Sequence, residues 1–179
     1  MKKVIPAFLF CFVSIQIFSQ TQRKVSTYLL TQYNKTLYDY TMGNNPWGAG
    51  LGLQTIFNSE TKLKSIIEFT GDVYLENYTV LRLNPDGSVP ENGNDVRAAV
   101  NFFAGSSFHP SQNIYLSLVT GPSFVGEQIL LGIKPSFGFY FSKDQKWMGK
   151  VSYINVFNRA RIADKDFGSI SVAIGRKLF

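Results

Sequence analysis

The residues of this sequence best suited to chemistry are charged side chains at alternate positions of otherwise apolar segments. They are Lys64, Glu68, Asp72, Arg97, Lys134 and Lys150, with Lys177 as a further candidate. Alternate residues of a β-strand point to the same face, so charges from several strands can converge in one interior. Buried charges must pair or be neutralised. We therefore expect an ion-paired network that fills a narrow interior, with a proton or ion path as the alternative interpretation.

The single histidine lies in the segment His109-Pro110-Ser111-Gln112. A Ser and a His this close together could take part in hydrolysis. A nucleophile also needs an oriented base and a site that excludes water, and nothing in the segment indicates either. Proline and small polar residues are typical of a tight turn. We expect a turn here and predict that the protein is not an enzyme.

Metal and phosphate sites are not predicted. With Cys11 as the one cysteine and a single histidine, the chain lacks the ligands that zinc and other soft metals prefer. Gly48, Gly50 and Gly52 superficially resemble a phosphate-binding loop, but no helix follows them. They indicate positions where interior space is short. A calcium site in the acidic segment 77–95 is an alternative with no diagnostic spacing, and we expect no cofactor.

The elements that must position the charged residues are segments of about a dozen residues in which apolar and polar side chains alternate. In 129–142, one face carries Ile, Leu and Phe, whereas the other carries mostly Gly, Ser and Lys134. A helix would instead repeat its apolar residues every three or four positions. The predicted strands are 27–37, 47–57, 63–76, 96–108, 114–124, 129–142, 147–158 and 167–179, of which 27–37 has the least clearly separated faces.

The connections between these strands fall into two classes. Tight turns are predicted at 58–62, 109–112 and 143–146, and longer loops at 38–46, 77–95 and 159–166, with 125–128 as an exception. Short turns at one end and longer loops at the other are typical of outer-membrane barrels. The fold class predicted is all-β: an eight-stranded, antiparallel, up-and-down transmembrane β-barrel with both termini at the short-turn end. The loop 77–95 is expected to extend its strands as a hairpin.

The sizes of the side chains indicate which face meets lipid. The interior of an eight-stranded barrel is narrow, and the polar faces hold most of the strand glycines and serines, so the bulky apolar faces are expected to point outward. Aromatic residues of the apolar faces gather at the strand ends, as they do in membrane barrels. They are Trp47, Phe124 and Phe157 at the long-loop end, and Phe57, Phe108, Phe141 and Trp147 at the short-turn end.

The first 20 residues have the features of a secretory signal peptide. Lys2 and Lys3 precede the apolar run 4–18, and Ser19 and Gln20 supply a cleavage zone. The run is shorter than the roughly 20 residues a spanning helix needs, which disfavours the alternative of a membrane anchor. We therefore predict a signal peptide at 1–20 and one barrel domain at 21–179. Cys11 follows the bulky Phe10 inside this leader, so lipid attachment is not expected.

Composition excludes two further classes. The chain is 45% hydrophobic, 15% aromatic and 17% charged, which is incompatible with long disordered structure. Its formal net charge is +6, two units of which belong to the leader, so no nucleic-acid partner is indicated.

Over residues 27–179 the chain resembles the small outer-membrane β-barrel proteins of Gram-negative bacteria. The resemblance rests on the leader, the alternating strands, the aromatic ends and the terminal Phe179, and it implies outer-membrane lipid as a partner, with another envelope protein as a further candidate. Three features depart from the pattern. Lys177 and Gly175 stand where alternate apolar residues are usual, so Phe179 should face inward or follow a bulge. Pro135 should cause a bulge or a broken ladder, and Arg176 on the apolar face must lie near the interface.

Three functions remain open from the sequence. The first is a non-enzymatic outer-membrane barrel with a structural or interaction role through its outer loops. The second is a soluble periplasmic barrel that binds a ligand as lipocalins do, with its apolar face inside. The third is an outer-membrane lipid-modifying enzyme, which needs a polar catalytic cluster at the outer rim.

Overall fold

Eight β-strands make up the described part of the protein. The computed structural model describes residues 25–38, 47–75, 97–125, 128–158 and 166–179. The strands are β1 Val25–Tyr38, β2 Trp47–Phe57, β3 Leu63–Leu75, β4 Arg97–Phe108, β5 Ile114–Val125, β6 Gln128–Tyr140, β7 Trp147–Val156 and β8 Phe167–Lys177. Each corresponds to a predicted segment, including the weakly patterned first one, although several ends differ by one or two residues.

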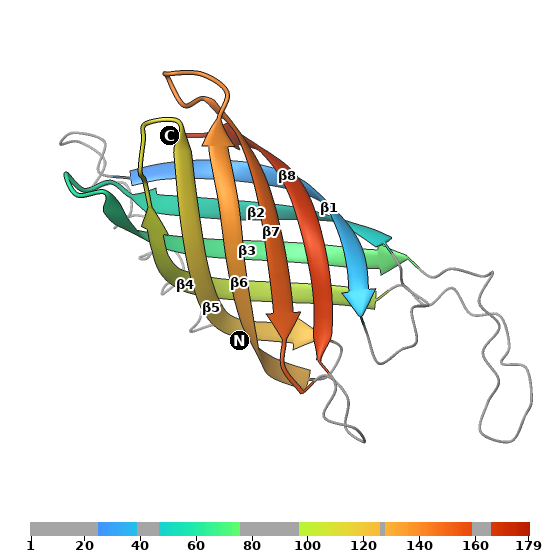
Figure 1. The fold of residues 1–179 in the computed structure, drawn as a ribbon. Coiled ribbons are helices and arrows are strands. Elements are labelled where there is room, and N and C mark those ends of the chain that lie inside the picture. The colour runs from blue at the N-terminus through green and yellow to red at the C-terminus, as the bar shows by residue number, and fades with distance from the viewer. Residues whose placement is uncertain (1–24, 39–46, 76–96, 126–127, 159–165) are drawn as a thin grey trace, which may run out of the picture.

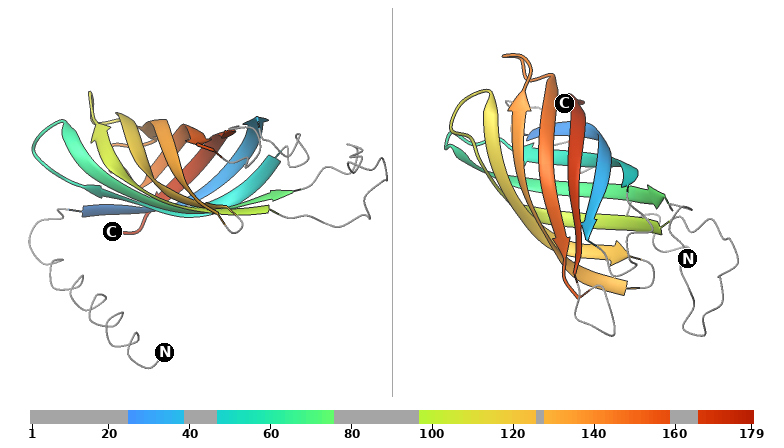
Figure 2. Two further views of the ribbon diagram at one scale, coloured as in Figure 1. Left: turned by 90° about the horizontal axis from the view of Figure 1, so that it is seen from below. Right: turned by 45° about the vertical axis from the view of Figure 1, so that its right-hand side comes forward.

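The strands form a closed barrel (Figures 1 and 2). Each strand pairs antiparallel with the next, and β8 pairs with β1 to close the sheet. This confirms the predicted eight-stranded, antiparallel, up-and-down topology. Closure leaves no strand edge unpaired, which is the condition for a sheet to lie in lipid. Among the described residues, no helix is long and apolar enough to span a membrane.

The two ends of the barrel differ. The turn rim is the end where β1 begins at Val25, β8 ends at Lys177, and the connections 58–62, 109–113 and 141–146 join their strands. The loop rim is the opposite end. The connections 39–46, 76–96, 126–127 and 159–165 at that end lie outside the described residues, as does the predicted leader at 1–20. The predicted hairpin extension and the calcium alternative at 77–95 fall there too.

Side chains alternate between the exterior and the interior along every strand. The exterior is built from large apolar residues, including Leu51, Phe69, Phe102, Leu131 and Val172, all of them exposed. The interior faces carry glycine, serine, amide and charged residues, such as Gly52 and Ser136. The predicted orientation, with bulky apolar side chains outward, is therefore what the structure has.

The interior also contains large side chains, which the size argument did not anticipate. Tyr28, Phe103 and Tyr115 are fully buried inside the barrel, together with Ile56 and Met148. Glycines make room for them: a Cβ at Gly138 would collide with the Tyr115 ring, and one at Gly132 would collide with Phe103. Large residues thus fill the space above glycines on the adjacent strand or on the next strand but one, as close packing requires.

Two local expectations can be checked. Pro135 has the second of its two expected effects, a broken ladder, because the pairing of 134–135 with β7 is interrupted while the strand keeps one register with β5 and β7. The register shift lies elsewhere, between Thr36 and Tyr38 where β1 pairs with β8. Phe179 does not face inward: it lies beyond the end of β8 and is 69% exposed.

Candidate functional site in the barrel interior

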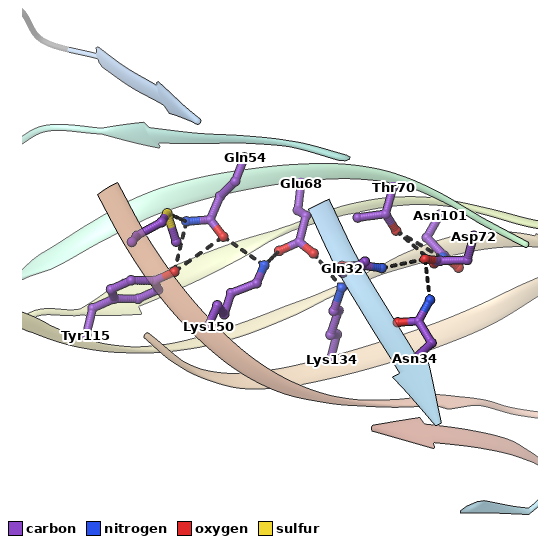
Figure 3. A network of polar contacts seen from close by, with 11 residues as sticks. Gln32, Asn34, Gln54, Glu68, Thr70, Asp72, Asn101, Tyr115, Lys134 and Lys150 are labelled. Carbon is purple, nitrogen blue, oxygen red and sulfur yellow. Dashed lines mark hydrogen bonds and ion pairs between the residues drawn. The ribbon is translucent and has the colours of Figure 1, made fainter. Parts of the chain in front are cut away.

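The centre of the interior is an ion-paired triad from three strands. Glu68 of β3 accepts from Lys134 of β6 at 2.6 Å through one carboxylate oxygen, and from Lys150 of β7 at 2.6 Å through the other. All three side chains are buried. Figure 3 shows the two lysines approaching the carboxylate from the opposite wall. Residues 66 positions apart or more along the chain meet here because each occupies an inward position near the middle of its strand.

Neutral groups extend the triad toward the turn rim. Lys150 also donates to Oε1 of Gln54 at 2.9 Å, and Nε2 of Gln54 lies 3.1 Å from the Tyr115 hydroxyl. The same amide nitrogen lies 4.0 Å from Sδ of Met148. The ammonium group of Lys150 is therefore stabilised by a chain of hydrogen bonds through Gln54 that ends at Tyr115, in the aromatic part of the interior.

Asp72 forms a second cluster closer to the loop rim. Its Oδ1 accepts from Gln32 at 2.5 Å and from Asn34 at 2.7 Å, both on β1. Its Oδ2 accepts from Asn101 of β4 at 3.2 Å and from Thr70 at 3.5 Å. Among the described residues, the groups that contact the Asp72 carboxylate are neutral donors, and side-chain amides solvate it as water would.

Of the predicted charged set, the structure brings together Glu68, Lys134 and Lys150, with Asp72 in the adjoining cluster. Lys64 lies apart from them, near the turn rim, where its Nζ is 3.4 Å from Oδ1 of Asn58. Arg97 is the first residue of β4, opposite Tyr74 on β3, and its side chain lies outside the described residues. The further candidate, Lys177, ends β8 opposite Tyr28, away from the triad. The predicted strands 63–76 and 167–179 already placed Lys64 and Lys177 near strand ends, and the structure agrees.

Sequence reasoning missed the amides. Gln32, Asn34, Gln54 and Asn101 hold the two clusters together, yet a search for charged groups passes over them. Their position in the alternating pattern could have identified them, because each lies on the same face of its strand as the glycines, serines or charged residues.

His109 closes the turn-rim side of the interior. Its Nε2 lies 3.1 Å from the hydroxyl of Ser107, and its ring stacks on Tyr115 at 5.4 Å between centroids. Burial, followed by the nearby positive charge of Lys64, lowers the pKa of His109 to about 4. Ser111 instead accepts from the backbone N–H of Asn113 within the turn. The predicted turn is therefore present, and His109 contacts Ser107 and not Ser111.

The loop rim carries a smaller polar group. Tyr38 of β1 hydrogen-bonds Tyr153 and donates to Asn155 at 2.5 Å, and Asn155 donates to Asp166 at 2.9 Å. Among the described residues, no three His, Cys, Asp or Glu side chains lie close enough to hold a metal ion. In the described part of the chain, the charged groups of the interior are hydrogen-bonded, whereas Oε1 of Gln32 and Oδ1 of Asn101 have no hydrogen-bond partner.

The exterior has the aromatic ends that the sequence predicted. Trp47, Phe124 and Phe157 are exposed near the loop rim, and Phe57, Phe108, Phe141 and Trp147 near the turn rim. Arg176 lies at the turn rim, with its guanidinium carbon 5.7 Å from the centre of the Trp147 ring. This placement meets the requirement that a charge on the apolar face reach the interface.

Comparison with solved structures establishes the fold. The crystal structure of Ail, the attachment invasion locus protein of Yersinia pestis, in complex with the heparin analogue sucrose octasulfate is 11% identical, with a TM-score of 0.57 over 86% of this chain and 97% of that one. The backbone structure of the same outer membrane protein in a phospholipid bilayer nanodisc is 12% identical, with a TM-score of 0.54 over 86% and 99% of the two chains. A further crystal structure of Ail has 13% identity and a TM-score of 0.53 over 86% and 97%.

No protein-family model and no curated protein sequence matches the chain. The chain therefore has the fold of small eight-stranded transmembrane barrels, established by structure at low sequence identity.

Proposed function

We propose that this protein is a non-enzymatic barrel of the Gram-negative outer membrane, exported by its leader, with a structural or interaction role carried by the connections at the loop rim. The observation that carries the proposal is the exterior, where large apolar side chains are exposed on all eight strands. Monomeric soluble proteins rarely expose continuous apolar surface of this kind. An apolar exterior of this kind is suited to contact with the hydrocarbon chains of lipids.

The asymmetry of the two rims supports an orientation. The turn rim has three short connections, the start of β1 and the end of β8, and short turns are usual on the periplasmic side of such barrels. The connections at the loop rim then face outward. Ail has been crystallised with a heparin analogue, and the outer loops of this chain, 77–95 above all, are where we place recognition of an external partner.

The interior supports a structural role for the barrel wall. The Glu68 triad links β3 to β6 and β7 across the lumen, and both of its ammonium groups contact the one carboxylate. A role in catalysis would need a group that is oriented but not satisfied. The polar group at the loop rim, from Tyr38 to Asp166, is composed of mutual hydrogen bonds.

Cell fractionation tests the proposal. The protein, expressed with its leader in a Gram-negative host, should sediment with outer membranes and resist extraction by sodium carbonate. Protease added to intact cells should cut within 77–95 and leave the strands intact. Recovery of folded protein in the aqueous periplasmic fraction would refute the membrane location and favour the soluble ligand-binding barrel. Cleavage at the short turns of intact cells would refute the orientation.

A further inference from the structure

Two basic residues and a tryptophan meet at the turn rim, where β7 begins and β8 ends. Trp147, the first residue of β7, is paired with Arg176 near the end of β8. The backbone N–H of Lys177 donates to the carbonyl oxygen of Lys146 at 2.8 Å, so the residue before β7 lies beside the same end of β8. We call Lys146, Trp147 and Arg176 the basic corner. The ladder between the two strands fixes the position of these residues relative to one another.

Arg176 lies on the lipid-facing side of the basic corner. It is exposed, and it follows Val172 and Ile174 along the outward face of β8. Its guanidinium carbon lies over the Trp147 ring, 5.7 Å from the ring centre, which is a favourable place for a cation. Among the described residues, no carboxylate forms an ion pair with Arg176. Its guanidinium N–H groups can therefore donate to a ligand outside the barrel.

Lys146 adds a second cation, which is only weakly held within the protein. Its Nζ lies 3.0 Å from Oδ2 of Asp144, and the two side chains are 74% and 48% exposed. Ion pairs between side chains this exposed contribute little to stability, so another anion can replace Asp144 at small cost. Lys143 of the same turn is also exposed. The corner thus has more positive charge than Asp144 can neutralise.

Positive charge predominates over the whole turn rim. The described residues of this rim include two carboxylate side chains, Glu60 and Asp144. They include six cationic side chains: Lys62, Lys64, Lys143, Lys146, Arg176 and Lys177. Basic residues at the edge of a membrane attract anionic lipids. Charge complementarity therefore favours a negatively charged partner at this end of the barrel.

The apolar neighbours of the basic corner set its depth in the bilayer. The N–H of Phe141 donates to the carbonyl oxygen of Trp147 at 3.1 Å, and Phe141, Trp147 and Leu178 are all exposed. Tryptophan is enriched where lipid chains meet headgroups, so a guanidinium over the Trp147 ring lies near the depth of the lipid phosphates. A guanidinium can hold two phosphate oxygens at once. A phosphate that carries hydrocarbon chains matches both the charge and the apolar surroundings of the corner, whereas a free anion matches only the charge.

We propose that the basic corner binds the phosphate group of an anionic phospholipid in the leaflet at the turn rim. Arg176 holds two phosphate oxygens, and Lys146 contacts the headgroup. The lipid chains lie against Trp147, Val151 and Ile174, which are all exposed. The site rests on the membrane location proposed above and adds a selectivity to it, because the corner prefers phosphatidylglycerol to a zwitterionic lipid with the same chains.

Fluorescence quenching in mixed bilayers tests this proposal. In the variant Trp47→Phe, Trp147 is the one remaining tryptophan. Brominated phosphatidylglycerol and brominated phosphatidylcholine are compared at the same mole fraction in vesicles of phosphatidylcholine. Quenching of Trp147 should give an association constant about fivefold higher for phosphatidylglycerol, the factor that one cation contributes beside anionic lipid.

Variants of Arg176 assign the preference to the corner. Arg176→Gln, in the same background, should lower the ratio of the two association constants toward equality. Arg176→Lys keeps the charge but lacks the planar fork, so its ratio should be intermediate. The matched control is Lys35→Gln, because Lys35 is an exposed cation on the outward face near the loop rim. It should leave the ratio at Trp147 unchanged, and heat-dependent electrophoretic mobility shows whether each variant is folded.

Equal quenching by the two brominated lipids would overturn the lipid site, whereas an absence of quenching by both would refute the membrane location itself. A preference that Arg176→Gln leaves unchanged would overturn the assignment to the basic corner. So would a preference that inorganic phosphate abolishes at an ionic strength where chloride preserves it, because the corner would then be a site for a free anion. If Arg176→Gln does not fold, Arg176→Lys takes its place, and an unchanged ratio has the same meaning.

Discussion

At the scale of single residues, Glu68 has the largest electrostatic role in the described interior. It is the shared partner of two buried ammonium groups. A buried ion pair is not by itself evidence of high stability, since desolvation offsets much of the attraction, but removal of one partner leaves an uncompensated buried charge. The triad therefore makes the barrel sensitive to one substitution in particular.

We expect Glu68→Gln to lower the free energy of unfolding by about 3–5 kcal/mol, because Lys134 and Lys150 would keep their charges without a counter-charge. Urea unfolding in lipid vesicles, followed by tryptophan fluorescence, measures this. The control Glu60→Gln alters an exposed carboxylate in a turn and should change stability little. A change at Glu68 no larger than at Glu60 would contradict the central role of the triad.

The pKa of His109 is a second prediction at this scale. NMR titration of the ring should give a pKa of about 4, and Lys64→Gln should raise it because a neighbouring positive charge is removed. The folded value lies below the unfolded value of about 6.5. His109 thus contributes stability that is complete above pH 6.5 and is lost as the pH falls from 6.5 toward 4. A titration midpoint near 6.5 would show that the ring is solvated and not packed on Tyr115.

At the scale of the elements, the fit between a glycine on one strand and a large side chain on the next sets how the strands pack. Gly138 of β6 is paired with Tyr115 of β5, whose ring covers it. Gly71 of β3 has open space where a Cβ would lie. The two positions separate the effect of packing from the general cost of replacing a strand glycine.

Gly138→Ala should destabilise the barrel by about 1–3 kcal/mol, since its methyl group would push the Tyr115 ring from its place. Gly71→Ala should be neutral or slightly stabilising. Thermal unfolding of both variants, monitored by electrophoretic mobility of folded and unfolded forms, provides the comparison. Equal effects at the two positions would mean that the ring moves freely.

At the scale of the whole molecule, the distribution of side chains is the reverse of that in a soluble globular protein. The exterior is apolar, and the interior is polar with an aromatic part. Its two tryptophans mark the ends of the apolar exterior: Trp47 begins β2 at the loop rim and Trp147 begins β7 at the turn rim. Both are exposed to the surroundings of the barrel. Tryptophan prefers the interface of a bilayer to its centre.

Lipids brominated near the glycerol end of the chain should therefore quench the fluorescence of both tryptophans more strongly than lipids brominated near the chain terminus. Trp47→Phe and Trp147→Phe isolate the two signals. Strong quenching by chain-terminal bromine in either variant would place that rim inside the hydrocarbon core and refute the location of the belts.

The alternation of residue types was sufficient to predict the eight strands, the barrel and the outward apolar face. These follow from local sequence because a strand has period two, and lipid demands one apolar face on every strand. The same alternation identified the candidate charges, because each of them falls on the polar face of a clearly alternating strand: Glu68, Asp72, Lys134 and Lys150.

What the tertiary structure alone decided is which inward residues meet. The stagger between strands places Glu68 beside Lys134 and Lys150 and brings Gln32 and Asn34 to Asp72. It also aligns the serines of five strands into one row. Position along a strand gives the face of a residue and the rim it is nearer to, but not which inward residues of other strands it meets. That depends on the shear of the closed sheet, a property of all eight strands together.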